Sequence, residues 1–398
     1  MKITLFSNFL NHLMLPFCEV MYRKLGDDYK FVATIPTDED RIRLGYHDMN
    51  KQYPFVLASY ESENNFKEAM KLALTSDVII TGSAPEIFTS ERVKLGKLTF
   101  RYYERVYKKG LWSVLLPRYL FHMVTKHTRY INKNLYMLCA SAYTAGDFSL
   151  MGAYRKKTYK WGYFTEVKKH DIDELLRLKN QADVEILWAG RFLRWKHPEK
   201  AVYVAKRLKN DGYSYNMKMI GIGERERSVK KLIDDYGLSD RITLLGAMPP
   251  ENVRIYMEHA DIFLFTSDYN EGWGAVLNEA MNSGCAVVAS HAAGAAPFMV
   301  KHGENGLVYK NNNDNDLYIQ TKALMDNRDL RDRLGRNAFS TLCNEWNAER
   351  AANSFISLCE SLLRGDGSGK SPESGPCSVA TPLAQHKVYD SMISGVSL

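Results

Sequence analysis

A strand, a glycine-rich turn and a helix follow one another between residues 261 and 282, and this segment constrains the fold more than any other. The apolar run 261–266 has the length and composition of a buried strand. The turn holds Gly272 and Gly274, and the run 275–282 consists mostly of helix formers. Strand, glycine turn and helix in this order are typical of doubly wound α/β domains.

Two glutamates, Glu271 and Glu279, lie in the turn and on the helix of this segment. A helix that opens after a glycine turn points backbone N–H groups and a positive dipole end above the sheet, where phosphate is the usual occupant. Carboxylates beside a phosphate can bind neutral hydroxyl groups. Phosphate and hydroxyls together indicate a sugar nucleotide, and the alternative is a tight turn with two solvated carboxylates.

The run 267–281 resembles the Glu-x7-Glu motif of family 4 retaining glycosyltransferases. That family has the GT-B fold, an α/β architecture of two Rossmann-like domains that face a cleft. The resemblance implies that Glu271 is catalytic and contacts the donor sugar, and that Glu279 holds the ribose hydroxyls. Backbone groups of the same segment would then face sugar and phosphate: Gly272, Trp273, Gly274, Ala275 and Val276.

A second strand-like run, 184–189, is followed by Gly190, Arg191 and Lys196. These residues resemble the family's Gly-Arg…Lys segment, whose two cations hold the donor diphosphate. Such chemistry needs cations, because the leaving diphosphate gains negative charge as the glycosidic bond breaks. Arg194 competes for the same role, and a basic surface loop is the alternative interpretation.

Glycine turns at Gly221 to Gly223 and at Gly246 occur where the family has turns that line the nucleotide, and Gly223 is predicted to bind donor. Each turn is weak by itself, because every doubly wound fold has such turns. After Pro297 the family usually has glutamate, whereas this chain has Phe298. That departure leaves the role of a carboxylate at this turn open.

Residues 1–165 alternate between strands and helices, which predicts a parallel sheet in an acceptor-side domain. The expected strands are 2–6, 29–34, 55–58, 78–81, 98–100 and 137–140. Polar residues after two of these strands are acceptor-side candidates: Asn8, His12, Arg101 and Glu104. A capping or core role for His12 and salt bridges for Arg101 and Glu104 are the alternatives.

Changes in composition divide the rest of the chain. Residues 165–183 are charged and predict a linker, and 184–345 predict the nucleotide-sugar domain. Helix 346–364 is expected to cross back to the first domain, as C-terminal helices of GT-B proteins often do. Residues 365–398 are rich in glycine, serine and proline, which predicts a largely disordered tail whose deletion leaves fold and activity intact.

The chain has 398 residues, a net charge of +7 and six scattered cysteines, which predicts two or three domains and reduced thiols in a cytosolic protein. Three acidic triplets, at 38–40, 171–173 and 314–316, resemble metal-binding Asp-x-Asp pairs, but none follows a strong buried strand. They are interpreted as a polar loop and two helix caps. Since Arg191 and Lys196 supply the positive charge, no metal and no cofactor is predicted.

Residues 92–133 carry many cations interleaved with aromatic residues, against the single acid Glu104. This pattern predicts binding to an anionic membrane surface, with aromatic rings at the headgroup level. The alternative is an ordinary basic helix with its aromatic residues in the core. No nucleic-acid-binding motif accompanies the stretch, so nucleic acid is not expected as a partner.

The function predicted from these observations is retaining transfer of a sugar from a nucleotide-sugar, of which a UDP-sugar is expected, to a glycan or lipid-linked saccharide. The site would be cytoplasmic, at the inner face of the membrane if the basic stretch binds it. A GT-B sugar-nucleotide epimerase and a non-catalytic carbohydrate-binding protein are the alternatives. A dehydrogenase is disfavoured, because the turn at Gly221 lacks the third glycine of the dinucleotide motif.

Overall fold

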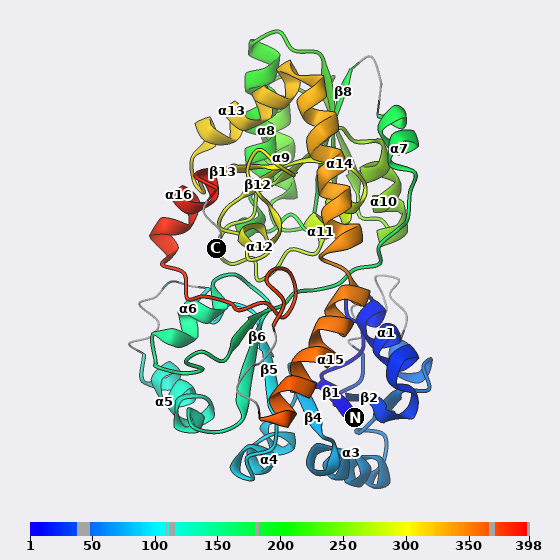
Figure 1. Cartoon of the computed structure of the whole chain (residues 1–398). Coiled ribbons are helices and arrows are strands. Elements are labelled where there is room, and N and C mark those ends of the chain that lie inside the picture. Colours follow the sequence, from blue (N-terminus) through cyan, green and yellow to red (C-terminus); the bar gives the residue numbers. More distant parts are fainter. Residues whose placement is uncertain (38–47, 109, 111–115, 180–182, 366–370, 396–398) are drawn as a thin grey trace. The chain divides into compact units, whose positions relative to one another are not determined.

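The computed structural model describes residues 1–37, 48–108, 110, 116–179, 183–365 and 371–395 (Figure 1). These residues form two compact units. Unit 1 comprises Met1–Glu166 and Asn347–Pro382, and unit 2 comprises Val167–Trp346 and Leu383–Leu398. The first two of the acidic triplets differ in what the structure shows of them: residues 38–40 lie outside the described residues, whereas Asp171 caps a helix.

Within the described residues, unit 1 is built on a seven-stranded parallel sheet in the order β3-β2-β1-β4-β5-β6-β7. The strands are β1 (Ile3–Ser7), β2 (Tyr29–Ala33), β3 (Val56–Ala58), β4 (Val78–Thr81), β5 (Thr99–Tyr103), β6 (Leu135–Cys139) and β7 (Thr158–Lys160). The strands predicted from sequence in this half are all present, with ends shifted by a few residues.

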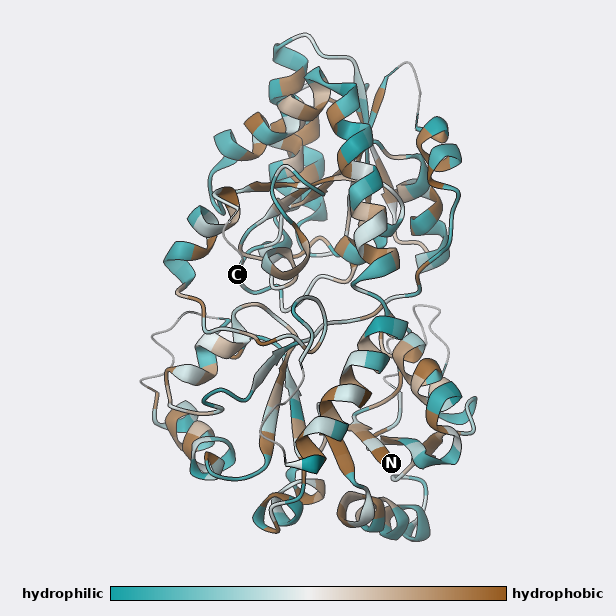
Figure 2. Cartoon of the chain, viewed as in Figure 1, coloured by the Kyte–Doolittle hydropathy of each residue, from teal (hydrophilic) through white to brown (hydrophobic). Residues whose placement is uncertain are grey.

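The helices of unit 1 are α1 (Leu15–Leu25), α3 (Glu63–Thr75), α4 (Ser90–Lys94), α5 (Pro117–Lys126), α6 (Thr144–Ser149) and α15 (Ala348–Arg364). Local sequence sets their ends. Helix α3, for example, begins where the Ser62 hydroxyl accepts a hydrogen bond of 3.1 Å from the backbone N–H of Asn65. Figure 2 shows apolar residues gathered on β1 and β4, which lie at the centre of the sheet.

Unit 2 has, in its described part, a six-stranded parallel sheet in the order β10-β9-β8-β11-β12-β13. The strands are β8 (Val184–Ala189), β9 (Tyr215–Ile220), β10 (Ile242–Gly246), β11 (Ile262–Phe265), β12 (Ala286–Ser290) and β13 (Leu307–Tyr309). In each sheet the order of the parallel strands reverses once, between β1 and β4 in unit 1 and between β8 and β11 in unit 2. In doubly wound folds ligands bind outside the carboxyl ends of the strands at this reversal.

The helices of unit 2 are α7 (Ile172–Leu178), α8 (Pro198–Asn210), α9 (Glu226–Asp235), α10 (Pro250–His259), α11 (Val276–Asn282), α12 (Ala296–Met299), α13 (Asp314–Asp326), α14 (Arg328–Asn344) and α16 (Val388–Ile393). The expectation of a linker over 165–183 is wrong for α7. Leu175 and Leu176 are buried in unit 2, so this charged segment is an amphipathic helix of that unit.

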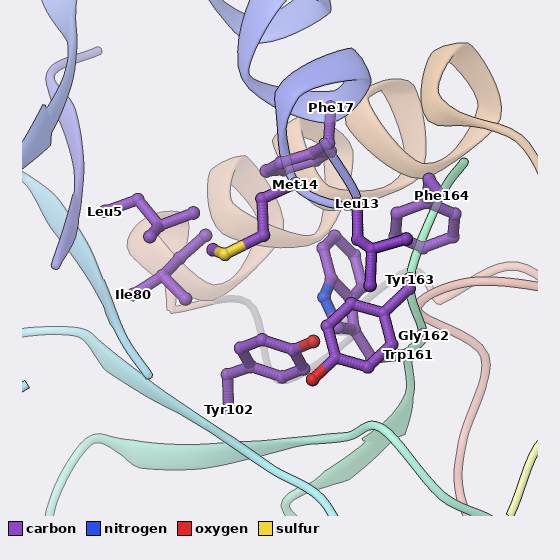
Figure 3. Close-up of a pocket in the computed structure, with 10 residues that line it drawn as sticks. All are labelled: Leu5, Leu13, Met14, Phe17, Ile80, Tyr102, Trp161, Gly162, Tyr163 and Phe164. Atoms are coloured by element: carbon purple, nitrogen blue, oxygen red, sulfur yellow. The ribbon is translucent and has the colours of Figure 1, made fainter. Parts of the chain in front are cut away.

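A small cavity of about 20 Å³ lies in unit 1 beside β1, β4 and β5, as Figure 3 shows. It has room for about one water molecule. Its walls come from the start of α1, the central strands and the segment after β7: Leu5, Leu13, Met14, Phe17, Ile80, Tyr102, Trp161, Gly162, Tyr163 and Phe164. The lining is apolar except for the two tyrosine hydroxyls.

Helix α15 belongs to unit 1, although it follows the segment Val167–Trp346 of unit 2 in the chain. It begins at an Asn347 cap, whose side chain accepts a hydrogen bond of 2.8 Å from the Arg350 N–H. Its buried Phe355 lies at ring-centroid distances of 5.0 Å from Phe100 and 5.8 Å from Trp161. The apolar periodicity of α15 therefore fills the core of unit 1.

The expectation of a largely disordered tail is wrong for residues 371–395. The backbone of Cys377 and Ser378 exchanges hydrogen bonds of 2.8 and 2.7 Å with Lys160, and Ala380 N donates to Thr158 O at 3.0 Å. The tail thereby covers the edge strand β7, whose backbone groups need partners. Glycine, serine and proline lower mean hydropathy, but three short hydrogen-bonded contacts need little apolar sequence.

Because the tail covers β7, the variant Ala380→Asp should lower the melting temperature of the full chain. Ala380 is 1% exposed, so the new carboxylate would lose water without gaining a partner, at a cost of about 1 to 3 kcal/mol or more. The matched control is the neighbouring Val379→Asp, because Val379 is 54% exposed. Thermal unfolding measures both. Equal melting temperatures for the two variants would contradict the docking of the tail.

Candidate functional site

The β8–α8 loop places Lys196 at the carboxyl end of β8, in a single helical turn over Arg194–Lys196. The loop begins at Gly190, and the chain turns into α8 at His197, which has left-handed backbone angles of φ 49° and ψ 53°. Pro198 then starts the helix, as proline does well at a first helical position. The sequence Lys-His-Pro therefore fixes where the lysine side chain leaves the loop.

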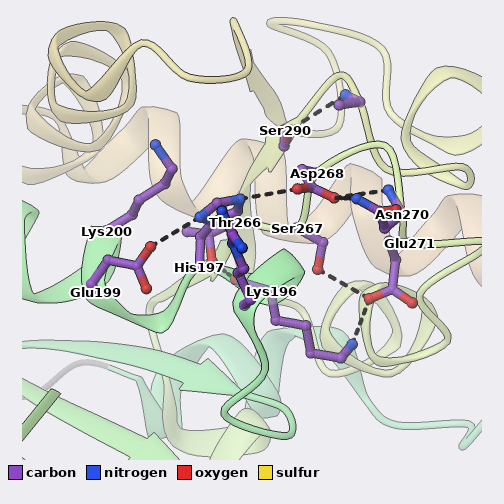
Figure 4. Close-up of polar contacts among 12 residues, drawn as sticks. Lys196, His197, Glu199, Lys200, Thr266, Ser267, Asp268, Asn270, Glu271 and Ser290 are labelled. Carbon is purple, nitrogen blue, oxygen red and sulfur yellow. Dashed lines mark hydrogen bonds and ion pairs between the residues drawn. The ribbon is translucent and has the colours of Figure 1, made fainter. Parts of the chain in front are cut away.

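The β11–α11 loop places Glu271 against this lysine (Figure 4). The Lys196 Nζ to Glu271 Oε2 distance is 2.5 Å, and the Ser267 hydroxyl donates to the same oxygen at 3.1 Å. The side chains of Lys196 and Glu271 are only 15% and 14% exposed. The structure thus brings together two residues that lie far apart in sequence and were predicted to share one site.

Further contacts join the same two loops. The backbone N–H of Asp268 donates to Trp195 O at 2.8 Å, and the Thr266 hydroxyl donates to Lys196 O at 2.6 Å. His197 bridges the loops with its ring, since Nε2 lies 3.1 Å from Asp268 Oδ2. These contacts hold the loops in register across the reversal between β8 and β11.

His197 carries a positive charge at neutral pH. Burial alone would lower its pKa, but hydrogen bonds to Asp268 and Glu199 outweigh burial and raise the pKa to about 9. The pKa values of Glu199 and Asp268 are lowered, because each accepts from the charged imidazole although burial opposes the shift. Sequence reasoning missed His197 and Asp268, although a histidine beside Lys196 and an aspartate beside the motif were visible.

Two glycines are required by close contacts. Gly221 has φ +131°, and a Cβ there would lie 2.0 Å from the Gly190 carbonyl oxygen. Gly274 has φ +94°, and its Cβ would lie 2.2 Å from the ring of Phe265. Any larger residue would push apart the β8 and β9 loops or open the turn before α11. These turns therefore need glycine for packing, whatever they bind.

Arg191 and Arg194 both lie on the β8–α8 loop with exposed side chains, and neither side chain forms a hydrogen bond or ion pair with a described residue. Gly223 follows β9 close to this loop, because a Cβ there would lie 2.7 Å from the Phe192 carbonyl. The cations predicted to hold diphosphate thus occupy one loop, with Arg191 and Arg194 open to solvent and Lys196 paired.

The motif tryptophan is buried. Trp273 is 1% exposed, and its ring N–H donates to Asn278 Oδ1 at 2.9 Å. Its ring lies 5.7 Å from that of Trp346, against which Phe298 is stacked at 5.9 Å. The side chain therefore packs inside unit 2, three residues before α11 begins at Val276. Phe298 completes an aromatic cluster with Trp273 and Trp346.

Glu279 lies in the first turn of α11, and its carboxylate has no hydrogen bond or ion pair with another described side chain. Burial raises its pKa to about 7, and the positive charge of Arg254 opposes the shift. A half-buried carboxylate without a hydrogen-bond partner is costly. This position is therefore suited to gain hydrogen bonds from a bound molecule.

The acceptor-side candidates of unit 1 have different environments. The buried guanidinium of Arg101 forms two hydrogen bonds to Glu86, of 2.6 and 3.0 Å, which makes it structural. Glu104 accepts from the Tyr163 hydroxyl at 2.9 Å and pairs with Lys108 at 2.6 Å. Asn8 accepts from the Ser7 hydroxyl at 3.1 Å, and His12 lies half-buried in the turn before α1.

The interpretation of 92–133 as a basic surface is wrong for three of its cations. Arg92 is fully buried and donates to backbone carbonyls of Ala73, Ser76, Asp77 and Leu98. Arg101 is paired with Glu86 as above, and buried Arg105 lies 3.6 Å from Asp147. Burial of cations is costly unless they are paired or hydrogen-bonded; carbonyl groups satisfy Arg92, and carboxylates pair with Arg101 and Arg105. Lys109 and Trp112 lie outside the described residues.

A family of known proteins resembles the second unit in sequence. Residues 172–341 match the sequence profile of the family described as "Glycosyl transferases group 1". Unit 2 is therefore similar to group 1 glycosyltransferase domains over most of its length. The matched residues include the Lys196 and Glu271 loops, and they lie almost entirely within unit 2.

Curated relatives of the group 1 domain carry related names. An uncharacterised glycosyltransferase of Methanocaldococcus jannaschii is 26% identical over 192 residues, which cover 48% of each chain. The amylovoran biosynthesis glycosyltransferase AmsK of Erwinia amylovora is 33% identical over 128 residues, 31% of each chain. The matches thus span about half or less of the length of these relatives.

Solved structures share the fold over most of the chain. The crystal structure of Anabaena HepE in complex with UDP has a TM-score of 0.68 and 16% identity, and covers 92% of this chain and 100% of its own. S. aureus TarM has a TM-score of 0.57 and 15% identity, over 74% of this chain and 58% of its own. The protein therefore has two parallel-sheet Rossmann-like domains, as in GT-B glycosyltransferases.

The charge on His197 predicts that stability falls at alkaline pH. Its pKa is raised from 6.5 to about 9 in the folded protein, so its contribution is complete below pH 6.5 and disappears as pH rises through about 9. The free energy of unfolding should fall by no more than about 3 kcal/mol from this group. Urea unfolding between pH 6 and 10 measures it.

His197→Gln should flatten this alkaline decline, whereas the control His259→Gln, at an exposed histidine of α10, should keep the wild-type slope. Identical pH profiles for wild type and His197→Gln would show that the bridge between the two loops adds no stability.

Proposed function

We propose that the protein is a retaining glycosyltransferase that transfers a sugar from a UDP-sugar donor to a glycan or lipid-linked saccharide acceptor. The observation that carries the proposal is the Lys196–Glu271 contact across the sheet reversal, with exposed Arg191 on the same loop. UDP in the HepE structure and the polysaccharide named for AmsK support the donor and acceptor classes.

In the proposed mechanism Lys196 exchanges partners. Without donor its charge is neutralised by Glu271, which limits the cost of holding both groups in a partly buried site. The diphosphate of the donor would take the lysine, together with Arg191. Both cations then oppose the negative charge that grows on the leaving diphosphate, and no metal ion is required for that task.

Once Lys196 has moved to the diphosphate, Glu271 would be free to bind the donor sugar. Its carboxylate, still held by Ser267 at 3.1 Å, accepts hydrogen bonds from sugar hydroxyls and fixes the anomeric carbon above the diphosphate. Glu279, which has no described side-chain partner, would bind the ribose hydroxyls. In a retaining reaction the acceptor attacks the face that the diphosphate leaves, and the leaving oxygen takes the acceptor proton.

On the acceptor side, Glu104 is the residue of unit 1 that we assign to acceptor hydroxyls. It is partly exposed at the carboxyl end of β5, and Tyr163 and Lys108 hold its two oxygens. Asn8 and His12, in the β1–α1 loop, remain candidates for the same role. Arg101 is no longer a candidate, because Glu86 occupies its guanidinium.

Lys196→Ala should slow sugar transfer by roughly 10²-fold or more, the usual loss when one fixed charge stabiliser is removed. The matched control is Lys168→Ala, which breaks another Lys–Glu pair of unit 2, at 2.9 Å to Glu258. Steady-state release of UDP from a panel of UDP-sugars, together with product analysis, measures both variants. Unchanged turnover in Lys196→Ala would remove this residue from the mechanism.

The same assay separates the alternative functions. A transferase releases UDP and yields a glycosylated acceptor. An epimerase converts one sugar nucleotide into another and needs no acceptor. A carbohydrate-binding protein turns over none of the donors. Glu271→Gln should reduce turnover more than stability, and a loss of melting temperature with full specific activity would make the glutamate structural.

We also propose that unit 1 binds an anionic membrane surface through α5. This helix has one buried residue, Met123, whereas Phe121 is 71% exposed and Leu120 and Val124 are 44% and 41% exposed. Arg118 lies exposed on the same helix, so apolar and cationic side chains meet there as membrane-surface helices require. No helix in the described part of the chain has the length and apolar character to cross a bilayer.

Phe121→Glu should abolish sedimentation with liposomes of anionic lipid at low salt, because the ring would enter the interface and nearby cations add about 1 kcal/mol each. The control is Leu95→Glu, at an apolar residue of unit 1 that is 59% exposed outside α5. Binding by the wild type should fall with salt and with neutral lipid. Equal recovery of the wild type in the supernatant with both lipids would refute this surface.

A further inference from the structure

His291 follows β12 directly and is 4% exposed, and its ring contacts the donor loop, defined here as residues 267–274. The Tyr269 hydroxyl lies 2.9 Å from His291 Nε2, and the two rings pack edge to face at 5.7 Å. On the other side of the imidazole, the backbone N–H of Asn311 donates to Nδ1 at 3.0 Å. The histidine thus joins the donor loop to the segment after β13.

These contacts fix the tautomer of the imidazole. A backbone N–H can only donate, so Nδ1 must be the acceptor and the proton lies on Nε2, which donates to the Tyr269 oxygen. The Tyr309 carbonyl, 3.4 Å from Nδ1, is then a neighbour and not an acceptor. Burial lowers the pKa of His291 to about 4, which keeps the ring neutral in this arrangement.

The outer face of His291 is covered by the C-terminal helix α16. The ring of Tyr389 lies 5.4 Å from the imidazole at an interplanar angle of 61°. Figure 1 shows α16 beside β13, and Val388 and Met392 are buried there, at 1% and 6% exposure. These apolar contacts hold the short helix in place on unit 2.

Tyr389 is also fixed at its hydroxyl. It donates to Asp316 Oδ2 at 2.7 Å, and the same carboxylate oxygen accepts from the Lys310 N–H at 2.6 Å. Asp316 therefore ties the tyrosine to the end of β13, where Asn311 holds His291. The tyrosine ring can shift away from the imidazole only if this hydrogen bond breaks.

The donor loop needs such support at Tyr269. On one side of this residue Asp268 is held by His197, and on the other Glu271 is held by Lys196, which the proposed mechanism removes when donor binds. After that exchange the contacts of Glu271 with Ser267 and of Tyr269 with His291 still hold the loop. Support that does not depend on Lys196 keeps the carboxylate placed at the moment of transfer.

We propose that α16 positions the donor loop through His291, which makes Tyr389 and His291 positioning residues for Glu271. The inference rests on the proposed function for its effect on turnover, but its structural core, coupling of the tail to residues 267–274, does not. The C-terminal segment is therefore part of the donor site of unit 2. Loss of its contact should loosen the loop without unfolding the unit.

The test uses the full chain with Tyr389→Ala and Tyr389→Phe. Hydrogen exchange of peptides that cover 267–274 is measured, together with kcat and KM for the UDP-sugar. Tyr389→Ala should speed exchange in the loop and lower kcat/KM by about tenfold, which corresponds to 1.4 kcal/mol of lost transition-state stabilisation. Tyr389→Phe keeps the ring but loses the hydrogen bond to Asp316, so its exchange rate and activity should lie between those of the wild type and Tyr389→Ala.

The matched control is Tyr213→Ala, which removes another Tyr–Asp hydrogen bond of unit 2, to Asp326. Tyr213 precedes β9, in the half of the sheet away from β13. This variant should lower the melting temperature without changing exchange in 267–274. Unchanged exchange in Tyr389→Ala, or an equal change in Tyr213→Ala, would overturn the inference. If the wild type turns over no donor, the proposed function fails while the exchange data still decide the coupling.

Discussion

The reversal of strand order between β8 and β11 is the constraint on which the candidate site depends. Because the two strands are neighbours while the chain leaves them toward different helices, their loops lie side by side, and side chains tie them together. Lys196 and His197 supply those ties from one loop, and Glu271 and Asp268 accept them from the other. The backbone bonds beside them fix the register, so a chemical site arises from two separate stretches of sequence.

This arrangement has an electrostatic consequence. Two ion pairs lie side by side, and they differ in what a donor could do to them. The His197 bridge is held by two carboxylates and by the geometry of the helix start, so it behaves as a permanent part of the fold. Lys196 has one carboxylate and a flexible stem, and it is the cation that can change partner. In the proposed mechanism His197 therefore keeps the loop ordered while the adjacent Lys196 changes its ion-pair partner.

Much of this structure could be predicted from the sequence, for identifiable reasons. Buried strands followed by glycine turns announce a parallel sheet, so the strand at 184–189 and the helix near 275–282 were placed within a residue. Motifs assigned Lys196 and Glu271 to one donor site, whereas the ion pair between them was not predicted and is seen only in the structure. The prediction for the tail was wrong because glycine, serine and proline lower its mean hydropathy. Burial of Ala380 and Val388 depends on where they lie in the fold and not on the composition of the tail.

The prediction that the cations of residues 92–133 are exposed was wrong for a related reason. A count of charges along 92–133 treats Arg92 as it treats Arg118, but only the fold decides which one meets water. Arg92 is buried, and its guanidinium donates five hydrogen bonds to backbone carbonyls in place of water. Arg118 lies on α5, whose exposed apolar face no periodicity argument could distinguish from a core-facing stripe. Sequence gives the pattern of a helix, and the tertiary structure decides which side of it is wet.

Phe298 places an apolar ring behind the donor loop, on the β12–α12 side. The backbone N–H of Gly294 donates to Glu271 O at 3.2 Å, and that of Ala295 donates to Trp273 O at 3.1 Å. Phe298 adds its ring to the cluster behind Trp273, at 6.4 Å. Each of these contacts supports the donor loop from behind. In the proposed donor site the apolar ring of Phe298 offers no hydrogen bond to sugar hydroxyls, so that task is left to Glu271 and to the backbone in front of it.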